Sequence, residues 1–415
     1  MNEHANVVVL GAGYAGLVAA MRLARQTDTR IVITLVNASD VFHERVRNHQ
    51  LAAGQALRRL PVASFLRGTR IRFLQGRVTA VEPARRRVAV QTADHVASVE
   101  YDYLVYALGS YIGTEGVPGA REHASTLDDA SARALADRVP GVAANRGRLL
   151  VVGGGNTGVE VATELAEAYR GLQITLVTRR SFARQLSPAA RAHVRSAFDR
   201  LGVQFVPNTA VTEVHARGAL TEHHETIPFD LCVWVGGFAV SDLARRAGLR
   251  VNERGQILVD RAMRSLSHPE IYAVGDAAHP ADDPGAPVRM SLYTATAMGA
   301  HGADCLAAEL AGKPGAAFGL SYGALGLSLG RHDGVVQFLD AHRDTPSRLI
   351  VTGALANQVR EFFVRLSVWV IKGQRLGPWT FYWPGKKKMR GVAVPAPRPS
   401  VPAAVATAST ARTDH

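Results

Sequence analysis

The fold of this chain is decided by the stretch NVVVLGAGYAG at residues 6–16. An apolar run, Val7 to Leu10, leads directly into Gly11, Gly13 and Gly16, and a run compatible with a helix follows. A strand, a glycine turn and a helix in this order predict a Rossmann unit that binds a dinucleotide. Gly11 permits the tight turn, Gly13 lets the backbone approach a pyrophosphate, and Gly16 lets the helix pack close to the strand. On this stretch alone, a glycine-rich loop without a ligand is the alternative.

Composition places the chain among large globular proteins with a basic surface. Its 415 residues predict two or three domains, and 47% of them are hydrophobic. Lys and Arg number 48 against 35 Asp and Glu, a net charge of +13. Such an excess suits nucleic acid, an acidic protein or an anionic membrane. Because most of the arginines are singly placed, we expect a solvated basic surface and no nucleic-acid partner.

Cysteine usage excludes several mechanisms. The chain has two cysteines, Cys232 and Cys305, and no C-x-x-C pair. This predicts a reducing compartment, with neither a disulfide framework nor a thiolate metal site, and we expect no metal. No convincing targeting segment or membrane-spanning run is found. We therefore expect a cytoplasmic protein, either free or peripheral on the inner face of the cell membrane.

A second glycine fingerprint follows a second apolar strand. The strand covers 149–152, and GGGNTGVE follows it at 153–160 with three glycines at the same G-x-G-x-x-G spacing. Downstream, QITLVT at 173–178 repeats ITLVN at 33–37 almost letter for letter. A whole β–α–β unit therefore occurs twice, which predicts two dinucleotide sites.

Five separate motifs carry a resemblance to a known family. They are GAGYAG (11–16), DYLVYALGS (102–110), GGGNTGVE (153–160), VWVGGF (233–238) and IYAVGDAA (271–278). The chain resembles the flavoproteins with two dinucleotide-binding domains, the pyridine nucleotide–disulfide oxidoreductase superfamily. Within it, the chain is most similar to the branch of type II NADH dehydrogenases and apoptosis-inducing-factor-like proteins. The resemblance covers roughly residues 5–340.

The resemblance implies an α/β protein with two Rossmann-like domains and a C-terminal β/α segment. The FAD-binding domain is expected in two parts, 1–118 and 241–320, with the NAD(P)H-binding domain at 119–240 between them. A C-terminal segment with a β-hairpin and an amphipathic helix is expected at 321–390. The Pro-, Ala-, Ser- and Thr-rich end, 391–415, predicts disorder.

The family places FAD on the first fingerprint and NAD(P)H on the second. The residues that this implies for FAD are Gly11, Gly13, Tyr14, Ala15, Gly16, Asn37, Arg45, Ala107, Gly109, Gly275 and Asp276. Those implied for the nicotinamide dinucleotide are Gly153, Gly155, Asn156, Thr157, Gly158, Thr178, Arg179, Arg180, Arg184 and Gly236. An aspartate at a strand end can accept hydrogen bonds from ribityl hydroxyls, although Asp276 could also serve as an ordinary helix cap.

The residues after the second repeated strand favour NADPH over NADH. An NAD-specific site places an acid at the end of that strand, where this chain has Thr178. Arg179, Arg180 and Arg184 follow, and guanidinium groups grip a 2′-phosphate bidentately. The most similar branch usually prefers NADH, and a solvated turn is the alternative interpretation of these arginines.

Candidate catalytic residues are Glu160, Arg47 and His49. In similar flavoproteins the glutamate lies close to the contact between flavin and nicotinamide, although a carboxylate near a helix N-terminus is also stabilising in itself. Arg45, Arg47 and His49 follow the second strand, where relatives approach the flavin. They could stabilise negative charge there or deliver a proton. A solvated loop is the alternative for each of the three.

The electron acceptor is the least determined partner. Without a C-x-x-C pair the electrons must leave to a quinone-like or other small acceptor, or to a redox protein. Type II dehydrogenases line their quinone pocket with an A-Q-x-A-x-Q pattern, and the corresponding LYTATAM at 292–298 lacks both glutamines. Tyr293 is expected to shape a different acceptor pocket.

The C-terminal segment combines an amphipathic helix with aromatic and basic residues. Residues 354–372 place Leu355, Phe362 and Trp369 at helical spacing, and tryptophan, tyrosine and lysine follow up to residue 390. This composition is typical of a membrane surface. A helix packed on the flavin domain with a basic tail is the alternative.

The sequence therefore predicts an FAD-dependent NAD(P)H oxidoreductase of the NADH dehydrogenase-like kind. One alternative is a ferredoxin reductase-like electron-transfer protein whose basic surface docks an acidic partner. Another is an apoptosis-inducing-factor-like flavoprotein with a binding or sensory role. For the oligomeric state, the sequence is compatible with a monomer and with a homodimer.

Overall fold

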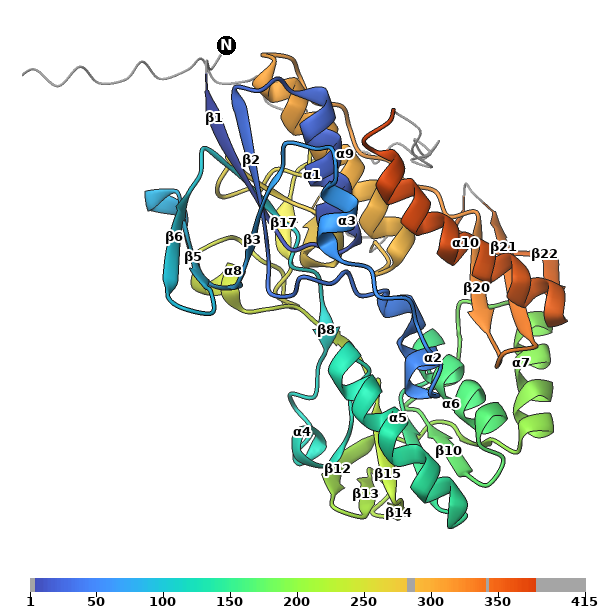
Figure 1. Cartoon of the computed structure of the whole chain (residues 1–415). Helices are drawn as coiled ribbons and strands as arrows, with labels where there is room; N and C mark the ends of the chain where they lie inside the picture. Colours follow the sequence, from blue (N-terminus) through green and yellow to red (C-terminus); the bar gives the residue numbers. More distant parts are fainter. Residues whose placement is uncertain (1–3, 282–287, 341–342, 378–415) are drawn as a thin grey trace, which may run out of the picture.

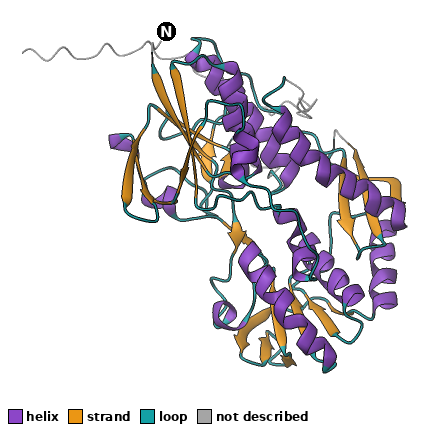
Figure 2. Cartoon of the chain, viewed as in Figure 1, coloured by secondary structure: helices purple, strands orange, loops and turns teal. Residues whose placement is uncertain are grey.

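The computed structural model describes residues 4–281, 288–340 and 343–377. Two lobes, each built on a parallel sheet, lie one above the other in Figure 1, and a long C-terminal helix runs along one side of both. Figure 2 shows that each lobe carries helices around its strands. The predicted α/β class with two Rossmann-like units is confirmed.

The first lobe is built on a five-stranded sheet of order β18-β7-β1-β2-β3, in which every pair is parallel. Its strands are β1 (Ala5–Leu10), β2 (Ile31–Asn37), β3 (Arg72–Gln75), β7 (Tyr103–Tyr106) and β18 (Ile271–Ala273). Such strands are buried on both faces and therefore read as continuous apolar runs. Accordingly, Val7 to Leu10 are at most 1% exposed.

Helices α1 (Tyr14–Gln26) and α9 (Leu292–Leu310) pack against each other beside this sheet. A three-stranded antiparallel sheet of β4 (Arg77–Glu82), β5 (Arg87–Gln91) and β6 (Val96–Glu100) shares the same core. Short elements complete the lobe: η1 (Arg45–Arg47), α3 (Val62–Leu66), η2 (Pro83–Arg85), α8 (Leu243–Arg246), β17 (Ile257–Val259), η3 (Gly275–Ala277) and β19 (Ala278–Pro280). The short helix α2 (Asn48–Ala52), between η1 and α3 in the chain, packs instead on helices of the second lobe. We did not predict α2, α3 or β6, because such short elements depend on tertiary packing more than on local pattern.

The second lobe repeats the plan with a four-stranded parallel sheet of order β11-β10-β9-β15. Its strands are β9 (Arg148–Val152), β10 (Gln173–Val177), β11 (Gln204–Val206) and β15 (Leu231–Trp234). Helices α5 (Asp129–Ala144), α6 (Asn156–Ala168) and α7 (Pro188–Leu201) cover it, and α4 (Ala120–His123) lies beside a small sheet of β12 (Val211–His215), β13 (Gly218–Thr221) and β14 (Thr226–Pro228).

The chain crosses between the lobes twice, and the two crossings pair with each other. β8 (Tyr111–Ile112) and β16 (Phe238–Ala239) form a two-stranded antiparallel ribbon. This ribbon holds the two connecting segments side by side between the lobes (Figure 1).

The C-terminal segment joins both lobes. β20 (Ala324–Ser328), β21 (Gly334–Asp340) and β22 (Thr345–Thr352) form an antiparallel sheet that lies against α6 and α7. Helix α10 (Gly353–Gly373), which we predicted at 354–372, follows and runs back to the first lobe. Its buried face is formed by residues three or four positions apart: Ala356, Arg360, Val364, Ser367 and Ile371.

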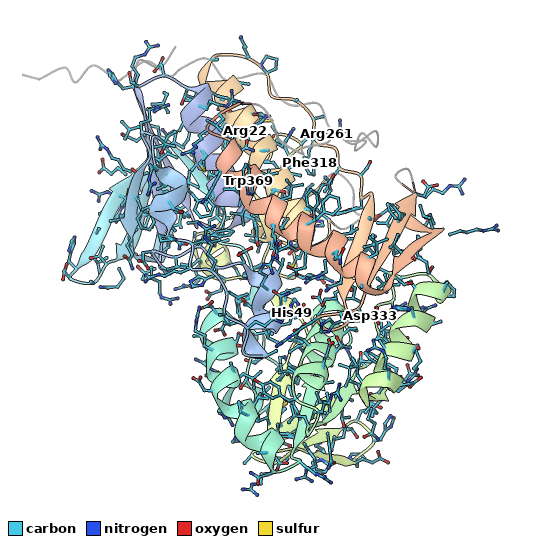
Figure 3. The ribbon with its side chains drawn as sticks, turned by 45° about the vertical axis from the view of Figure 1, so that its right-hand side comes forward. Arg22, His49, Arg261, Phe318, Asp333 and Trp369 are labelled. Carbon is cyan, nitrogen blue, oxygen red and sulfur yellow. The ribbon has the colours of Figure 1, made fainter. Side chains whose placement is uncertain are left out.

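A buried arginine of α1 ties the end of α10 to the first lobe. The Arg22 guanidinium donates to both carboxylate oxygens of Asp304 on α9, at 2.5 and 2.7 Å, and to Gln374 Oε1 at 3.2 Å. Figure 3 shows Arg22 beside these helices. Gln374 is fully buried, so its oxygen would lose its partner without Arg22.

We expect Arg22→Ala to lower the free energy of unfolding by about 2 kcal/mol, because it leaves Asp304 and Gln374 without their cation. Urea denaturation followed by circular dichroism measures the change. Arg25→Ala on the same helix is the matched control and should cost less than about 0.5 kcal/mol, since Arg25 is exposed. Equal losses would contradict this role of Arg22.

Candidate functional site

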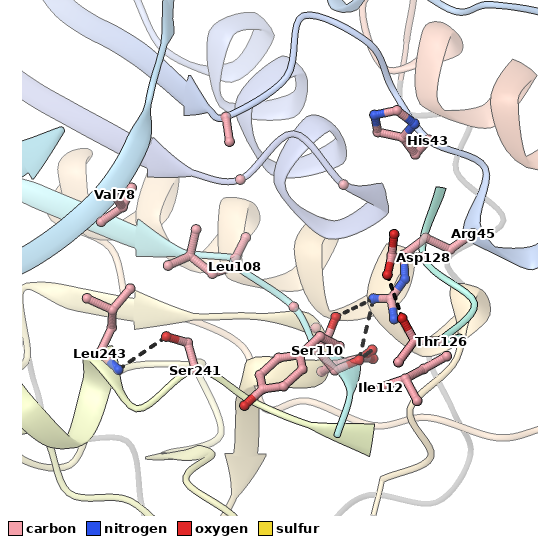
Figure 4. A pocket seen from close by; sticks show the side chains of 18 of the residues that line it. His43, Arg45, Val78, Leu108, Ser110, Ile112, Thr126, Asp128, Ser241 and Leu243 are labelled. Atoms are coloured by element: carbon pink, nitrogen blue, oxygen red, sulfur yellow. Dashed lines mark hydrogen bonds between the residues drawn. The ribbon is translucent and has the colours of Figure 1, made fainter. Parts of the chain in front are cut away.

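A cavity of about 1130 Å³ opens at the carboxyl ends of the first lobe's strands (Figure 4). Ten of the residues predicted for the first dinucleotide line it: Gly11, Gly13, Tyr14, Ala15, Asn37, Arg45, Ala107, Gly109, Gly275 and Asp276. They come from the loops after β1, β2, β7 and β18, which the parallel sheet brings to one edge. The carboxyl edge of an open α/β sheet is where such folds bind their ligands.

The three glycines of the first turn have distinct environments. Gly11 has φ +99°, and a Cβ on it would lie 2.5 Å from the carbonyl oxygen of Ala107. A Cβ on Gly16 would lie 1.8 Å from the carbonyl oxygen of Gly11. A Cβ on Gly13 would meet nothing within 4 Å. Gly11 and Gly16 are therefore required by the chain's own packing, whereas the space at Gly13 is open toward a ligand.

The second turn has the same geometry. Gly153 has φ +125°, and a Cβ on it would lie 2.6 Å from the carbonyl oxygen of Val235. A Cβ on Gly158 would lie 1.8 Å from the oxygen of Gly153, and one on Gly155 would meet nothing within 4 Å. The two units that repeat in the sequence therefore have the same turn geometry, including the open space at the middle glycine.

Asn37 supports the first glycine turn from the end of β2. Its Oδ1 accepts a hydrogen bond from the backbone N–H of Ala12 at 2.9 Å, and its Nδ2 donates to the carbonyl of Ser39 at 2.7 Å. An aspartate could not make the second bond, because an ionised carboxylate has no donor. The amide therefore has a structural reason besides any contact with a ribose.

Asp276 lies in a polar corner of the cavity with Ser110 and Arg45. Ser110 Oγ donates to Asp276 Oδ2 at 2.6 Å, and Arg45 Nη1 donates to the carbonyl of Ser110 at 2.6 Å. Burial raises the pKa of Asp276, while Ser110 and Arg45 oppose the rise. Figure 4 shows Arg45 extending across the cavity toward Ser110, with Thr126 and Asp128 nearby. Sequence reasoning missed Ser110, although it ends the DYLVYALGS motif.

The residues predicted to distinguish NADPH from NADH lie at the end of β10 and in the loop after it. Thr178 is buried against the backbone of Gly154, where an added Cβ would lie 2.6 Å from the threonine hydroxyl. Arg179, Arg180 and Arg184 are all exposed in the loop that follows. Among the described residues, no ion pair uses any of these three guanidinium groups, so all three remain available to an anion.

The other predicted members of this site lie around the second turn. Asn156 and Thr157 begin α6, and Asn156 Oδ1 accepts a hydrogen bond from Gln185 Nε2. Gly236 follows β15 and packs against the Trp234 ring, where an added Cβ would lie 3.1 Å from the indole. Gln185 was not predicted, because its proximity to Asn156 arises only when the loop after β10 folds back over α6.

The predicted catalytic residues lie outside the cavity lining, in a buried cluster of charges between the lobes. We call this the interlobe charge cluster: Arg47, His49, Glu160, Arg360 and Glu361. Arg360 Nη2 contacts Glu160 Oε1 at 2.9 Å, and Arg360 Nη1 contacts Glu361 Oε1 at 3.0 Å. Arg47 Nη1 contacts Glu361 Oε2 at 2.8 Å. Figure 3 shows His49 at the junction of the lobes.

The cluster fixes the protonation of its members. Burial raises the pKa of Glu160, while Arg360 and a hydrogen bond from the backbone N–H of Ser328 at 3.2 Å oppose the rise. Burial, with Arg360 and Arg47, holds the pKa of His49 well below its usual value. Arg360 Nη2 lies 3.4 Å from His49 Nε2 and can only donate, so the proton of neutral His49 is assigned to Nδ1. That Nδ1 lies 3.9 Å from Glu160 Oε2.

Arg360 and Glu361 were missed in the sequence. Arg360 occupies a position of the apolar register of α10, with Ala356 four residues before it and Val364 four after. A charge on the buried face of an amphipathic helix is a signal for a buried partner, because an unpaired buried charge is costly. The identity of that partner is decided only by the packing of α10 on β20–β22 and α1, which brings Arg360 to Glu160 of α6.

Tyr293, predicted to shape the acceptor pocket, lies in the first turn of α9. Its hydroxyl donates to the carbonyl of Ser321 at 3.2 Å, and its ring lies 5.9 Å from that of Tyr322. Tyr293 does not line the cavity described above, but Ala295, two residues further along α9, does.

No helix among the described residues is long and apolar enough to cross a membrane. The same part of the chain holds no group of three or more His, Cys, Asp and Glu side chains that could bind a metal.

Known proteins resemble this chain both in sequence and in structure. A family model described as pyridine nucleotide-disulphide oxidoreductase matches residues 5–299. An NADH dehydrogenase-like protein of Mycobacterium tuberculosis is 29% identical over 295 residues, 66% of this chain and 72% of that protein. A demethylphylloquinone reductase of Synechocystis is 28% identical over 375 residues, 83% of this chain and 89% of that protein. The structure of NDH2 from Plasmodium falciparum in complex with NADH matches with a TM-score of 0.75 at 14% identity, over 92% of this chain and 100% of that one.

The buried, neutral state of His49 predicts a pH dependence of stability. The unfolded chain binds a proton at this histidine below about pH 6.5, whereas the folded chain does not. Stability is therefore lost as the pH falls below 6.5, by up to about 1.4 kcal/mol per pH unit from this group. We expect His49→Gln to remove that part of the slope between pH 6.5 and 5.5, measured by urea denaturation. His123→Gln, which changes an exposed histidine, should leave the slope unchanged.

Proposed function

Because the chain belongs to the pyridine nucleotide-disulphide oxidoreductase family, we propose that its first glycine turn holds FAD and its second the nicotinamide dinucleotide of an NAD(P)H:acceptor oxidoreductase. The observation that carries this proposal is the pair of glycine turns with matched geometry, each open at its middle glycine. One of them faces a cavity of about 1130 Å³, ample for a ligand as large as a dinucleotide. The predicted family and enzyme class are confirmed.

The residues of the cavity fit FAD. The first turn of α1 offers unpaired backbone N–H groups and a positive dipole end for the pyrophosphate, beside the open space at Gly13. Asp276 would accept hydrogen bonds from ribityl hydroxyls, and Arg45 would supply a cation in the same corner of the cavity. Bound there, FAD would supply the hydride acceptor and the electron-transfer chemistry between the nicotinamide and a second acceptor. The protein's part is to hold, orient and shield the reacting groups.

We propose NADPH as the preferred reductant. An adenosine ribose lying over the second turn would bring its 2′ position toward the end of β10, where Thr178 carries no charge to repel a phosphate. Arg179, Arg180 and Arg184 are exposed and without an ion-pair partner among the described residues. A guanidinium that gains a phosphate contributes about 1.5 to 3 kcal/mol.

For Arg179→Ala we expect kcat/KM for NADPH to fall about tenfold to a hundredfold and kcat/KM for NADH to stay within about twofold. The rate of anaerobic flavin bleaching measures both. Arg191→Ala, which removes an arginine of α7 outside this loop, is the control and should change neither. An equal effect of Arg179→Ala on the two cofactors would contradict the 2′-phosphate contact.

We propose that Glu160 acts on the nicotinamide side of the reaction. Nicotinamide becomes cationic when it gives up its hydride, and a nearby carboxylate stabilises that charge. Arg360 and Ser328 both bond Glu160 Oε1, which leaves Oε2 facing His49 and the interlobe space. Arg360 is a positioning residue in this proposal, because it contacts Glu160 Oε1 and opposes the rise that burial causes in the pKa of Glu160.

We expect Glu160→Gln to slow flavin reduction by saturating NADPH at least tenfold, since the developing positive charge loses its carboxylate. Glu164→Gln is a matched control one helical turn further along α6. Glu164 is also buried, but it bonds Gln55 and Arg331 away from the interlobe charge cluster. Its substitution should leave the rate within about threefold. Stopped-flow reduction under anaerobic conditions distinguishes the two, and an equal loss in both would contradict the proposal.

We propose a quinone-like molecule as the electron acceptor, held beside Tyr293 and Tyr322. One relative is named a demethylphylloquinone reductase, which supports an aromatic two-electron acceptor. The rings of Tyr293 and Tyr322, whose centres lie 5.9 Å apart, offer aromatic surface that suits such a ring, and Tyr293 belongs to the helix whose Ala295 lines the cavity.

An acceptor screen with the anaerobically reduced enzyme tests the function as a whole. We expect NADPH to bleach the flavin within seconds and menadione to restore it much faster than ferredoxin does. Failure of both NADPH and NADH to reduce the flavin would overturn the oxidoreductase assignment for this site. Faster reoxidation by ferredoxin would favour the electron-transfer alternative.

We also propose peripheral membrane contact through the outer face of α10. Leu355, Phe362, Trp369 and Leu376 recur every seven residues and are 60, 60, 78 and 79% exposed. Seven residues make nearly two helical turns, so Leu355, Phe362 and Trp369 lie along one stripe of α10 about 20 Å long, and Leu376 lies in the turn that follows the helix. A stripe of Leu, Phe and Trp beside basic residues is typical of helices that lie in a bilayer interface. The predicted contact region extends to residue 390, and its part after 377 lies outside the described residues.

A further inference from the structure

The loop that carries the three arginines after β10 is held at its far end by the C-terminal sheet. We call residues 178–187 the arginine loop. Its last residue, Ser187, caps α7 with its hydroxyl, which accepts a hydrogen bond from the N–H of Ala190 at 3.2 Å. The backbone N–H of the same serine donates to Gln337 Oε1 on β21 at 3.1 Å. This bond joins residues 150 positions apart in the chain.

The amide of Gln337 connects two parts of the protein. Its side chain is fully buried, and its Nε2 donates to the carbonyls of Phe338 and Ser347, both at 2.8 Å. Because both amide hydrogens are used within its own sheet, Oε1 is left for the N–H of Ser187, and a buried acceptor without a donor is costly. The amide therefore binds its own sheet through its nitrogen and the arginine loop through its oxygen.

The middle of the arginine loop is fixed by the second glycine turn. Phe182 is buried, and the N–H of the next residue, Ala183, donates to the carbonyl of Gly154 at 2.9 Å. Arg184 follows directly and is exposed. This arginine therefore lies between one fixed point in the glycine turn and a second one at Ser187, three residues further along.

A fixed loop matters for the phosphate contact that we propose there. Bidentate binding requires the guanidinium to meet the phosphate at a defined position and angle. A loop that is ordered before binding loses less conformational entropy on binding than a loop that the ligand must order. NADH lacks the 2′-phosphate, so it gains nothing from the position of these arginines. Loss of the bond at Ser187 should therefore weaken the binding of NADPH and spare that of NADH.

We propose that Gln337 is a positioning residue for recognition of the 2′-phosphate of NADPH. The proposal rests on the NADPH preference proposed above and adds a residue of the C-terminal sheet to it. The turn before β21 contacts α7 at a second place, because Asp333 lies 2.8 Å from His193 and 2.6 Å from Arg200. Figure 3 shows Asp333 where the C-terminal sheet meets the second lobe. The C-terminal segment thus holds both α7 and the loop that leads into it.

The test removes the bond from either side in the full-length holoenzyme. Gln337→Met removes the acceptor and keeps a side chain of similar length. Ser187→Pro removes the donor, since proline has no backbone N–H and adopts the φ of −63° found at this residue. We expect each variant to raise the NADPH concentration that half-saturates anaerobic flavin reduction about threefold to tenfold. The value for NADH and the limiting rate with either cofactor should stay within about twofold.

Two controls separate this bond from a general loss of stability. Leu339→Ala shortens another buried side chain of β21, and Ser187→Ala removes the cap hydroxyl but keeps the backbone N–H. Both should keep the ratio of the NADPH and NADH values within about twofold of that of the wild type. A change of the ratio in the controls as large as in the two test variants would overturn the role of Gln337.

Trypsin supplies a measurement that needs no nicotinamide cofactor. It cleaves after arginine, and the arginine loop exposes three such sites. We expect cleavage within this loop, identified by mass spectrometry, to be about fivefold faster in Gln337→Met and Ser187→Pro than in the wild type and the controls. Unchanged cleavage in both variants would overturn the proposed hold on the loop.

The two measurements together distinguish the possible failures. Faster cleavage with an unchanged ratio of the NADPH and NADH values, in a wild type that prefers NADPH, would overturn the role of Gln337 in recognition and leave the NADPH preference standing. A wild type that does not prefer NADPH would overturn the proposed reductant, and this inference with it. Reduction of the flavin by either cofactor would still support the oxidoreductase function.

Discussion

The close contact of a helix with the turn before it is the constraint on which the rest of this structure depends. At Gly16 and again at Gly158, a single added carbon would lie 1.8 Å from a backbone oxygen. Only glycine allows the helix to start so close to the strand, and only then do the first N–H groups of the helix face the open space at Gly13 or Gly155. The open space at these middle glycines follows from that arrangement.

The two repeated units have diverged at equivalent positions. Asn37 ends β2 and bonds the backbone of the first turn, so its amide is part of the architecture. Thr178 follows β10 and packs against Gly154, which leaves the polar surface of that site to the arginines after it. Asn37 thus stabilises a turn, whereas the uncharged Thr178 leaves the arginines to determine the charge of its site. Both residues occur at the end of the equivalent strand of the repeated unit.

Helix α10 links the chemistry between the lobes to the surface of the molecule. Its inner face carries Arg360 into the interlobe charge cluster, and its outer face carries the apolar stripe. Burial of a guanidinium is tolerable there because Glu160 and Glu361 both contact it. The same rigid helix therefore fixes the orientation of a candidate catalytic carboxylate and of the proposed membrane surface.

The sequence by itself determined the α/β class, the two glycine turns, the family and the extent of α10, because these depend on local patterns of glycine, apolar periodicity and repeats. It also predicted one shared site for Arg45, Gly275 and Asp276, and the structure brings these three residues to one cavity, since strand ends of a parallel sheet share one edge. Only the tertiary structure decided that Glu160 meets Arg360 and that Ser110 bonds Asp276. Each of these contacts joins residues far apart in the chain, and no local pattern specifies which buried or clustered charge will face which partner.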